Sequence, residues 1–588
     1  MKKLPLAILA VAIHVFAAAQ TGQAWQQKLS PGLLEKARDN NAVPFLIELT
    51  GQADVRGAAK LRSKEEKGTF VFQTLKAFAD KSQAGLRSLL DARGVSYETV
   101  YIVNAIKTEG DLNLIREIAQ RSDVIRIFDN TPRRFAEPVE TKLDPGGSRS
   151  AIEWGIERIQ ADDVWAMGYR GQNVVVGGED TGYDWSHPAL RNQYRGYDAV
   201  RDTADHNYNW HDAIHVINGN NPDSINPCGL DSKVPCDDYG HGTHTMGTMV
   251  GLDGDNQIGV APDAKWCGCR NMERGWGAPF TYIECFEWFL APTDLNNENP
   301  DPAKAPHVIN NSWGCPESEG CDSSNFEIMN MVVNNLRQAG IVVVVSAGNS
   351  GSGCGSVNTP APIFEGSFSV GATAPNDTIA GFSSRGPVSV DGSNRLKPNV
   401  SAPGVWVRSS VPGGAYEFSS GTSMAGPHVV GLVALIISAN PELAGQVDLI
   451  EDIIEQTAVP KTTDQNCGEI PGSEVPNNTY GFGRIDALAA VEAALALIEP
   501  SATKDQQVHL ANVYPNPVTE ELIIALADDT PLSIELYNTQ GERLLSRNLG
   551  GAQGLFRLDM SSLAPGLYFY TLRSGNKIQP GKVMKVED

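Results

Sequence analysis

Three patterns of hydrophobic and polar positions follow one another along the chain. In the central region, about residues 151–500, short and wholly apolar runs recur at 174–176, 308–309 and 341–345. Segments with helical periodicity, such as 326–338, lie between them. Continuous apolar strands interleaved with helices indicate a parallel sheet with helices on both faces, and ligand sites in such sheets form at the carboxyl ends of strands.

The region before it combines strands and helices in another order. Residues 20–132 contain no cysteine, and they carry strand-like or helical segments at 43–47, 70–92, 101–103, 112–121 and 124–127. This order predicts a small α+β domain. The stretch 133–150 is charged and contains Pro and Gly, so we expect an exposed linker there.

The last region, residues 512–588, alternates apolar and polar positions, as in 532–537 and 567–572. Turn signals stand between these runs, at Gln540-Gly541 and Pro565-Gly566. Alternation with short turns predicts an antiparallel β-sandwich. The expected fold class is therefore α/β, with a parallel sheet covered on both faces, preceded by a small α+β domain and followed by a β-sandwich.

The first residues have the pattern of an export signal. Lys2 and Lys3 precede an apolar run at 4–16, and small residues follow at 17–19. This pattern predicts a signal peptide over residues 1–19. The net charge of -23 adds one exclusion, since such a surface repels phosphate backbones and argues against nucleic acid as a partner.

All nine cysteines lie in the central region. In an exported protein such clustering predicts disulfides, and Cys228 with Cys236 and Cys315 with Cys321 are local candidates. The odd count leaves at least one thiol unpaired. Cys267-Gly268-Cys269 has one intervening residue rather than two, so it is a poor zinc motif.

Three glycine-rich clusters place polar side chains where predicted strands end or helices begin. Asp180-Thr181-Gly182 follows the first central strand, and His241 opens a helix with the sequence 241–247. Ser423 lies in the third cluster, 421–428, which opens an apolar helix. An Asp, a His and a Ser at such ends can converge as orienting carboxylate, base and nucleophile.

These clusters resemble the three active-site signatures of the subtilase family, in that family's Asp, His, Ser order. The segment 346–351 resembles its oxyanion-hole segment, and further matches stand at 258–262, 383–387 and 402–404. The stretch 264–349 most resembles the bacillopeptidase F branch. The matches follow one another in the family's order over about 310 residues, so the resemblance is specific.

The resemblance implies a secreted serine endopeptidase that hydrolyses peptide bonds in proteins through an acyl-enzyme intermediate. Ser423 would be the nucleophile, His241 the general base and Asp180 the carboxylate that orients the imidazole. The amide of Asn349 and the backbone N–H of Ser423 would receive the oxyanion. Ser312, Trp313 and Gly314 would form a wall for an extended substrate.

The flanking regions also take roles from the resemblance. Residues 20–132 resemble a subtilisin-type propeptide, an intramolecular inhibitor that makes the chain a zymogen, and residues 512–588 resemble type IX secretion sorting domains. The expected partners are protein or peptide substrates, the propeptide itself and the outer-membrane secretion machinery. The expected location is outside the cell or attached to its surface.

No cofactor is required for this chemistry. We expect no metal ligands at the catalytic site, and no clear motif supports structural calcium, because the calcium-binding loop of some members is shortened here around 254–260. Two further features depart from the family. Glu179 stands where an apolar residue is usual, and the segment 191–238 is longer than in compact members. We expect this segment to be a surface loop that shapes specificity.

Other readings of these residues are weaker. Asp180-Thr181-Gly182 also fits an aspartic protease, but no second such triplet exists. We expect His187, His244 and His428 to be structural, since no His-Glu-x-x-His motif is present. Trp313 fits either a core aromatic or a subsite wall. The alternative function is a catalytically silent surface-binding protein that retains the fold, and the completeness of the catalytic set argues against it.

Overall fold

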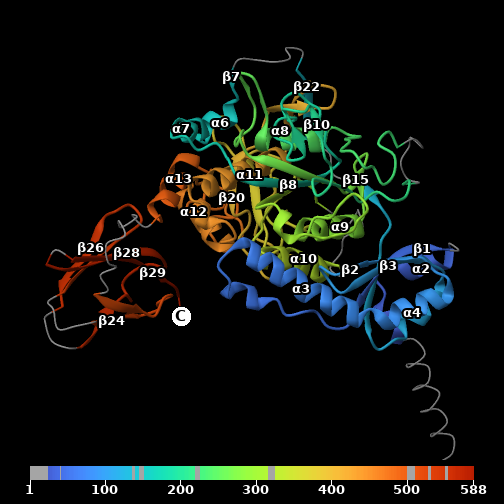
Figure 1. Ribbon diagram of the computed structural model, residues 1–588, viewed down its shortest axis with the longest axis horizontal. Coiled ribbons are helices and arrows are strands. Elements are labelled where there is room, and N and C mark those ends of the chain that lie inside the picture. The colour runs from blue at the N-terminus through green and yellow to red at the C-terminus, as the bar shows by residue number, and fades with distance from the viewer. Residues whose placement is uncertain are drawn as a thin grey trace, which may run out of the picture. The chain divides into compact units, whose positions relative to one another are not determined.

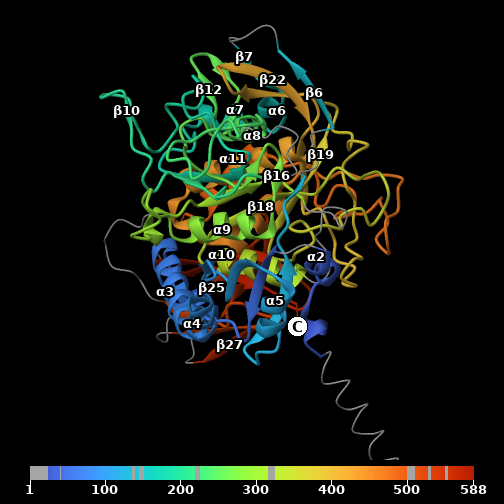
Figure 2. The same cartoon turned by 90° about the vertical axis from the view of Figure 1, so that its right-hand side faces the viewer.

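The computed structural model describes residues 24–39, 42–134, 139–144, 151–218, 226–314, 325–498, 510–526, 532–549, 554–575 and 577–587. The expected signal peptide, residues 1–19, lies outside them. The chain divides into two compact units, 1–494 and 495–588, each described by itself (Figures 1 and 2).

A parallel sheet of seven strands forms the centre of the first unit. The strand order is β11 (Trp210–Asp212), β14 (Lys265–Arg270), β8 (Val175–Asp180), β17 (Val308–Asn311), β18 (Val342–Ser346), β19 (Phe368–Thr373) and β20 (Val400–Pro403). Helices α8 (His241–Val250) and α11 (Thr422–Ala439) pack on one face, and α9 (Pro279–Leu290) and α10 (Phe326–Gln338) pack on the other (Figure 1). The predicted α/β arrangement is confirmed.

Helix α11 is the core helix of this domain. Its 18 residues are apolar enough to cross a membrane by length and composition, but 94% of that window is buried. It contacts α8 and five strands of the central sheet. Its hydrophobicity therefore serves packing against the sheet.

Shorter elements complete the catalytic region. They are β5 (Arg133–Arg134), β6 (Glu140–Leu143), β7 (Ala151–Ile152), α6 (Trp154–Arg158), α7 (Ala161–Ala166), β9 (Tyr197–Asp198), β10 (Thr203–Ala204), β12 (Leu252–Asp253), β13 (Asn256–Gln257), β15 (Met272–Glu273), β16 (Trp276–Gly277), β21 (Val407–Val411), β22 (Ala415–Ser420), α12 (Val447–Thr457) and α13 (Ala487–Ala496).

The N-terminal region folds around its own small sheet. Four antiparallel strands stand in the order β2 (Tyr97–Val100), β3 (Ala105–Gly110), β1 (Val43–Leu49) and β4 (Val124–Asp129), with helices α2 (Leu33–Asp39), α3 (Lys64–Ser82), α4 (Ala84–Arg93) and α5 (Leu112–Ala119). Phe45, Ile47, Leu86, Ile106 and Ile118 are completely buried in one apolar cluster of this region. The predicted α+β domain is present.

The strand expected at 101–103 is wrong, because these residues form the turn between β2 and β3. Ile102 and Val103 are apolar because they are buried in a cluster shared with α9 and α10 of the catalytic region. The backbone N–H of Ile102 donates to Glu287 of α9 at 2.8 Å, in place of a strand partner. A buried turn therefore has the same run of apolar residues in the sequence as a buried strand.

The expected linker at 133–150 contains two short strands. Strand β5 pairs antiparallel with β16, and β6 pairs antiparallel with β22. The long segment 191–238 is likewise more than a surface loop, because its strand β11 pairs with β14 at the edge of the central sheet.

Among the described residues, three disulfides crosslink the catalytic region: Cys228–Cys236, Cys269–Cys285, which joins β14 to α9, and Cys354–Cys467. The first confirms a prediction, whereas the Cys315–Cys321 pair lies outside the described residues. Among the described cysteines Cys267 is free and buried, in line with the odd count. Because Cys269 is bonded to Cys285, it offers no thiolate to a metal.

The second unit is a sandwich of two antiparallel sheets. One has the order β23 (Ala511–Tyr514), β24 (Glu521–Leu526), β27 (Leu555–Asp559), and the other β26 (Arg543–Asn548), β25 (Ser533–Tyr537), β28 (Gly566–Ser574), β29 (Lys577–Lys585). Ile524 and Leu558 of the first sheet share a buried cluster with Ile534, Leu536 and Leu572 of the second. The predicted β-sandwich is confirmed.

Candidate active site

Asp180, His241 and Ser423 come from three separate elements at the carboxyl end of the central sheet. Asp180 is the last residue of β8, His241 is the first residue of α8, and Ser423 is the second residue of α11. Their exposed fractions are 1%, 4% and 3%. This is the edge at which a parallel sheet places its ligand sites.

Glycines let these elements approach closely. Gly182 has φ +108°, and a Cβ there would lie 1.8 Å from the carbonyl oxygen of Cys236. A Cβ on Gly242 would lie 2.1 Å from the carbonyl oxygen of Gly182 and 3.0 Å from Cβ of Asp180. The glycines beside Asp180 and His241 are therefore needed to bring the end of β8 to the start of α8.

The carboxylate of Asp180 holds the imidazole of His241. Nδ1 of His241 lies 2.8 Å from Oδ1 and 2.9 Å from Oδ2 of Asp180. The backbone N–H of Thr181 donates to Oδ1 at 2.7 Å, which fixes the carboxylate. A proton on Nδ1 directs Nε2 away from Asp180 as the basic nitrogen.

Ser423 lies at the start of α11, beside the segment that follows β17. Its Oγ donates to the carbonyl oxygen of Ser312 at 3.2 Å, and Oγ of Ser312 donates back to the carbonyl of Ser423 at 3.1 Å. A cavity of about 510 Å³ is lined by both His241 and Met424, the residue after Ser423. The histidine and the start of α11 thus share one cleft.

Asn349 lies three residues after the end of β18, and α11 orients its side chain. Its Oδ1 accepts hydrogen bonds of 2.9 Å from both N–H and Oγ1 of Thr422. A Cβ built on Gly421 would lie 3.4 Å from Nδ2 of Asn349. The amide donor is therefore held next to the turn that carries Ser423.

Glu179 is completely buried beside Asp180. Its Oε1 accepts from Nε1 of Trp313 at 2.9 Å. Burial raises the pKa of this carboxyl well above its usual value, the indole bond lowers it in part, and the charge of Asp180 raises it further. The raised pKa favours the neutral acid, which is the form that a buried core accommodates at lower cost.

Trp313 is a core aromatic. Its side chain is 2% exposed and stacks on Tyr282 with ring centroids 4.0 Å apart and planes at 7°. A substrate can therefore meet the segment 312–314 through backbone groups, but not through this indole.

Asp237 is a positioning residue that the sequence did not single out. Its Oδ2 accepts from Oγ1 and N–H of Thr243 at 2.6 and 2.9 Å, and its Oδ1 accepts from Oγ1 of Thr181 at 2.8 Å. It therefore ties the residue after Asp180 to the first turn of α8. Its only signal in the sequence is its place four residues before His241.

The remaining histidines of this region bond to backbone groups, as expected of structural residues. Nε2 of His244 contacts the carbonyl oxygens of Val407 and Glu417 at 3.2 and 3.1 Å. Burial lowers the pKa of His244 to about 3 and that of His428 to about 4. Nε2 of His187 lies 3.0 Å from a backbone carbonyl.

A parallel α/β sheet that brings an Asp–His pair and a serine to its carboxyl edge is the arrangement expected of a serine peptidase. The protein-family model described as the Subtilase family matches residues 171–483, more than half of the sequence, so the chain belongs to the subtilase family. A second model, described as a secretion system C-terminal sorting domain, matches residues 512–586.

Individual relatives agree with the family. Bacillopeptidase F of Bacillus subtilis (strain 168) is 36% identical over 505 residues, which are 81% of this chain and 33% of that protein. Subtilisin E of the same organism is 29% identical over 409 residues, which are 68% of this chain and 87% of that protein. This chain thus spans about a third of the length of Bacillopeptidase F.

Among solved structures, the epidermin leader peptide processing serine protease of Staphylococcus aureus superposes with a TM-score of 0.55. The identity is 16%, and the match covers 77% of this chain and 99% of that one. At this identity the likeness supports the fold alone. With the family matches, the chain is a secreted serine protease, and its sorting domain directs it by type IX secretion to the cell surface or the outside.

Proposed function

We propose that the protein is an endopeptidase that works through an acyl-enzyme intermediate. Ser423 attacks the scissile carbonyl while Nε2 of His241 accepts its proton, and the same nitrogen then protonates the leaving amine. Water repeats the sequence to release the acyl group. The observation that carries the proposal is the buried contact between Nδ1 of His241 and both oxygens of Asp180, because this contact sets the tautomer that the mechanism needs.

The oxyanion of the tetrahedral intermediate would be received by two donors. One is Nδ2 of Asn349, whose carboxamide is oriented by its bonds to Thr422. The other is the backbone N–H of Ser423, an amide of the first turn of α11 that the helix dipole favours for negative charge.

An extended substrate would bind between two stretches of backbone. Residues 312–314 leave the sheet beside Ser423, and β16 pairs antiparallel with the chain's own β5. Strand addition of this kind gives affinity through main-chain hydrogen bonds, whatever the side chains are. Strand β16 is thus a second substrate wall that the sequence did not suggest.

The N-terminal domain would be the inhibitory propeptide of a zymogen. Besides the buried apolar cluster, polar contacts join it to the catalytic region: Lys64 Nζ donates to the carbonyl of Ala305 at 2.7 Å, and Asn335 Nδ2 donates to the carbonyl of Ile102 at 2.6 Å. Glu287 accepts from the backbone N–H groups of Tyr101 and Ile102. These contacts support a tightly docked inhibitor.

Proteolytic removal of the propeptide is proposed between about residues 132 and 151. A buried ion pair narrows the range of possible cleavage positions. Asp144 and Arg408 are both buried and paired at 2.5 Å, and Glu153 adds a contact of 3.0 Å to the guanidinium. Removal of Asp144 would leave Arg408 buried with less compensating charge, which is costly. Cleavage is therefore proposed before Asp144, so that the mature enzyme keeps this pair.

A serine-directed covalent probe tests the catalytic assignment. The purified mature enzyme should be labelled at Ser423, and the Ser423→Ala and His241→Ala variants should not be labelled. Ser409→Ala, a buried serine outside the triad, is the matched control and should label fully. Failure of the native enzyme to label or to cleave casein would favour the silent surface-binding protein, whereas labelling that persists in Ser423→Ala would refute the choice of nucleophile.

A further inference from the structure

A second cluster of metal-binding side chains lies where the N-terminal domain meets the catalytic region. A cavity of about 590 Å³ is lined there by Glu98, His211, His215, Glu284 and other residues. Glu98 belongs to β2 of the N-terminal domain, His211 to β11, and Glu284 to α9. His215 lies in the chain just after β11. This cavity is separate from the one that His241 and Met424 line beside the candidate active site.

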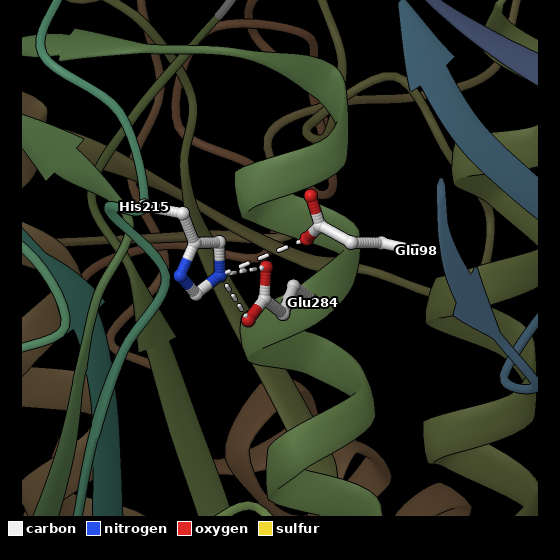
Figure 3. A group of neighbouring side chains, drawn as sticks. All are labelled: Glu98, His215 and Glu284. Atoms are coloured by element: carbon white, nitrogen blue, oxygen red, sulfur yellow. Dashed lines mark hydrogen bonds and ion pairs between the residues drawn. The ribbon is translucent and has the colours of Figure 1, made fainter. Parts of the chain in front are cut away.

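Figure 3 shows Nε2 of His215 and the carboxylates of Glu98 and Glu284 pointing toward one another. Nε2 of His215 lies 2.8 Å from Oε1 of Glu284 and 3.8 Å from Oε2 of Glu98. One donor atom from each of these three residues lies within 4.8 Å of the other two. A zinc ion with bonds of about 2.0–2.2 Å keeps its ligand atoms within about 4.4 Å of one another, so only small shifts are needed.

A fourth donor stands beside the three. Nε2 of His211 lies 2.8 Å from the same Oε1 of Glu284, and its ring lies parallel to Trp288 at a centroid distance of 5.9 Å. Two imidazoles and two carboxylates are a donor set suited to zinc and similar transition metals. Calcium and magnesium prefer oxygen ligands alone, so the histidines argue against them.

The surroundings of His215 provide an independent observation. Its other nitrogen, Nδ1, lies 2.6 Å from Oδ1 of Asp231. A carboxylate at the second nitrogen is the usual support of a metal-bound histidine, because it fixes the tautomer that presents the lone pair of Nε2. The side chains of His215 and Glu284 are 20% and 16% exposed, and that of Glu98 is 42% exposed. An ion can thus reach the site from solvent.

We propose that Glu98, His215 and Glu284, with His211 beside them, form a binding site for a divalent transition-metal ion such as zinc, and that this ion joins the N-terminal domain to the catalytic region. Binding replaces the proton on Nε2 of His215, which is released to solvent. Because Glu98 precedes the proposed processing site, the intact precursor binds the ion with a ligand that the processed enzyme lacks. This last consequence rests on the proposed zymogen function.

The test uses the full-length Ser423→Ala precursor, stripped of metal with a chelator and titrated with Zn²⁺ in equilibrium dialysis. We expect one tightly bound zinc, and Co²⁺ at the same site should give the visible absorption of a low-symmetry site with nitrogen and oxygen ligands. His215→Ala should weaken zinc binding at least about tenfold, and Glu98→Gln should weaken it by about tenfold. Glu109→Gln, an exposed carboxylate on β3, is the matched control and should bind as the parent does.

Glu98→Gln keeps the proposal testable if His215→Ala fails to fold, since Glu98 is partly exposed on β2. If the precursor takes up no zinc, or if Glu98→Gln binds zinc as tightly as the parent, the cluster is an ion-pair network without a metal and the proposal is wrong. Zinc binding is measured on the intact chain, so its outcome does not depend on whether the protein is a protease. If zinc binds as expected but Ser423→Ala is still processed, another protease makes the cut, and only self-processing is ruled out.

Discussion

Nε1 of Trp313 donates a 2.9 Å hydrogen bond to Oε1 of Glu179, the residue before Asp180. The bond connects the segment after β17 to the end of strand β8, next to the proposed catalytic Asp180. Burial this complete raises the pKa of the Glu179 carboxyl well above its usual value and so favours its protonated form. In that form Glu179 adds no negative charge beside Asp180 and His241.

Replacement of Glu179 by Gln should therefore leave folding and peptide hydrolysis near the native level at neutral pH. Gln is neutral, has almost the same shape, and keeps an oxygen for the indole of Trp313. Trp313→Phe should instead lower the free energy of unfolding by about 1–3 kcal/mol, because the buried Oε1 of Glu179 loses its donor. Thermal unfolding of both variants in the Ser423→Ala background measures this. A large loss of stability in Glu179→Gln would mean that the residue is ionised.

Glu455 on α12 should make stability depend on pH. Burial is the main cause that raises its pKa to about 7, a bond from Asn399 lowers it in part, and Glu451 and Asp452 raise it further. Because the pKa of Glu455 is higher in the folded than in the unfolded chain, the folded state keeps this proton up to a higher pH. The stabilisation is complete below about pH 4.3 and is lost as the pH rises through about 7.

Glu455→Gln should remove the loss of folding stability that the parent shows as the pH rises. The variant should be more stable than the parent at pH 8, by up to about 3 kcal/mol, and similar to it at pH 4. Unfolding by denaturant at the two pH values, again in the Ser423→Ala background, gives the difference. Glu442→Gln, an exposed residue before α12, is the control. An equal effect of Glu455→Gln at both pH values would contradict the shifted proton.

Asn349→Ala should reduce kcat by about 10²–10³ with little change in KM, because its amide would bind the oxyanion only in the transition state. Steady-state hydrolysis of a fluorogenic peptide by the mature enzyme measures both constants. Asn349→Asp should be similarly slow, since it keeps the size but removes the N–H donor. A rise in KM without a fall in kcat would assign Asn349 to substrate binding instead.

The ion pair of Asp144 and Arg408 predicts the first residues of the mature enzyme. N-terminal sequencing should find a terminus after Pro132 and before Asp144, and the Ser423→Ala precursor should remain uncut. Asp144→Ala should destabilise the mature enzyme by about 3 kcal/mol, because it weakens the compensation of a buried guanidinium. Glu140→Ala, exposed on β6 just before Asp144, is the control and should change little. A terminus beyond residue 144, with Asp144→Ala as stable as the parent, would refute this boundary.

The sequence predicted the parts of the fold that depend on local pattern. The unbroken apolar run at 341–345 corresponds to β18, and the glycine-rich clusters with Asp180 and His241 stand, as predicted, at the end of a strand and the start of a helix. The strand predicted for Tyr101 to Val103 was wrong, because a turn that is buried against another domain has the same apolar composition as a strand. The pairing of β5 with β16 carries no local signal at all, since backbone hydrogen bonds do not depend on the side chains of Arg133 and Arg134.

The same distinction holds for the sites. Recognisable motifs contain Asp180, His241, Asn349 and Ser423. The positioning role of Asp237 becomes visible only in the folded structure, where Thr181 and Thr243 donate hydrogen bonds to it. Glu98, His215 and Glu284 are far apart in the sequence and meet only when two domains dock. Clusters that form through tertiary contacts of this kind have no characteristic spacing in the sequence, so a motif search cannot find them.

The disulfide between Cys354 and Cys467 joins residues 113 positions apart, and the second of them stands near the end of the catalytic region. That crosslink can close only once almost the entire catalytic polypeptide has crossed the inner membrane into an oxidising compartment. Its formation thus reports that the chain has crossed at least as far as Cys467, and trapping free thiols during pulse labelling would time that event relative to later export across the outer membrane.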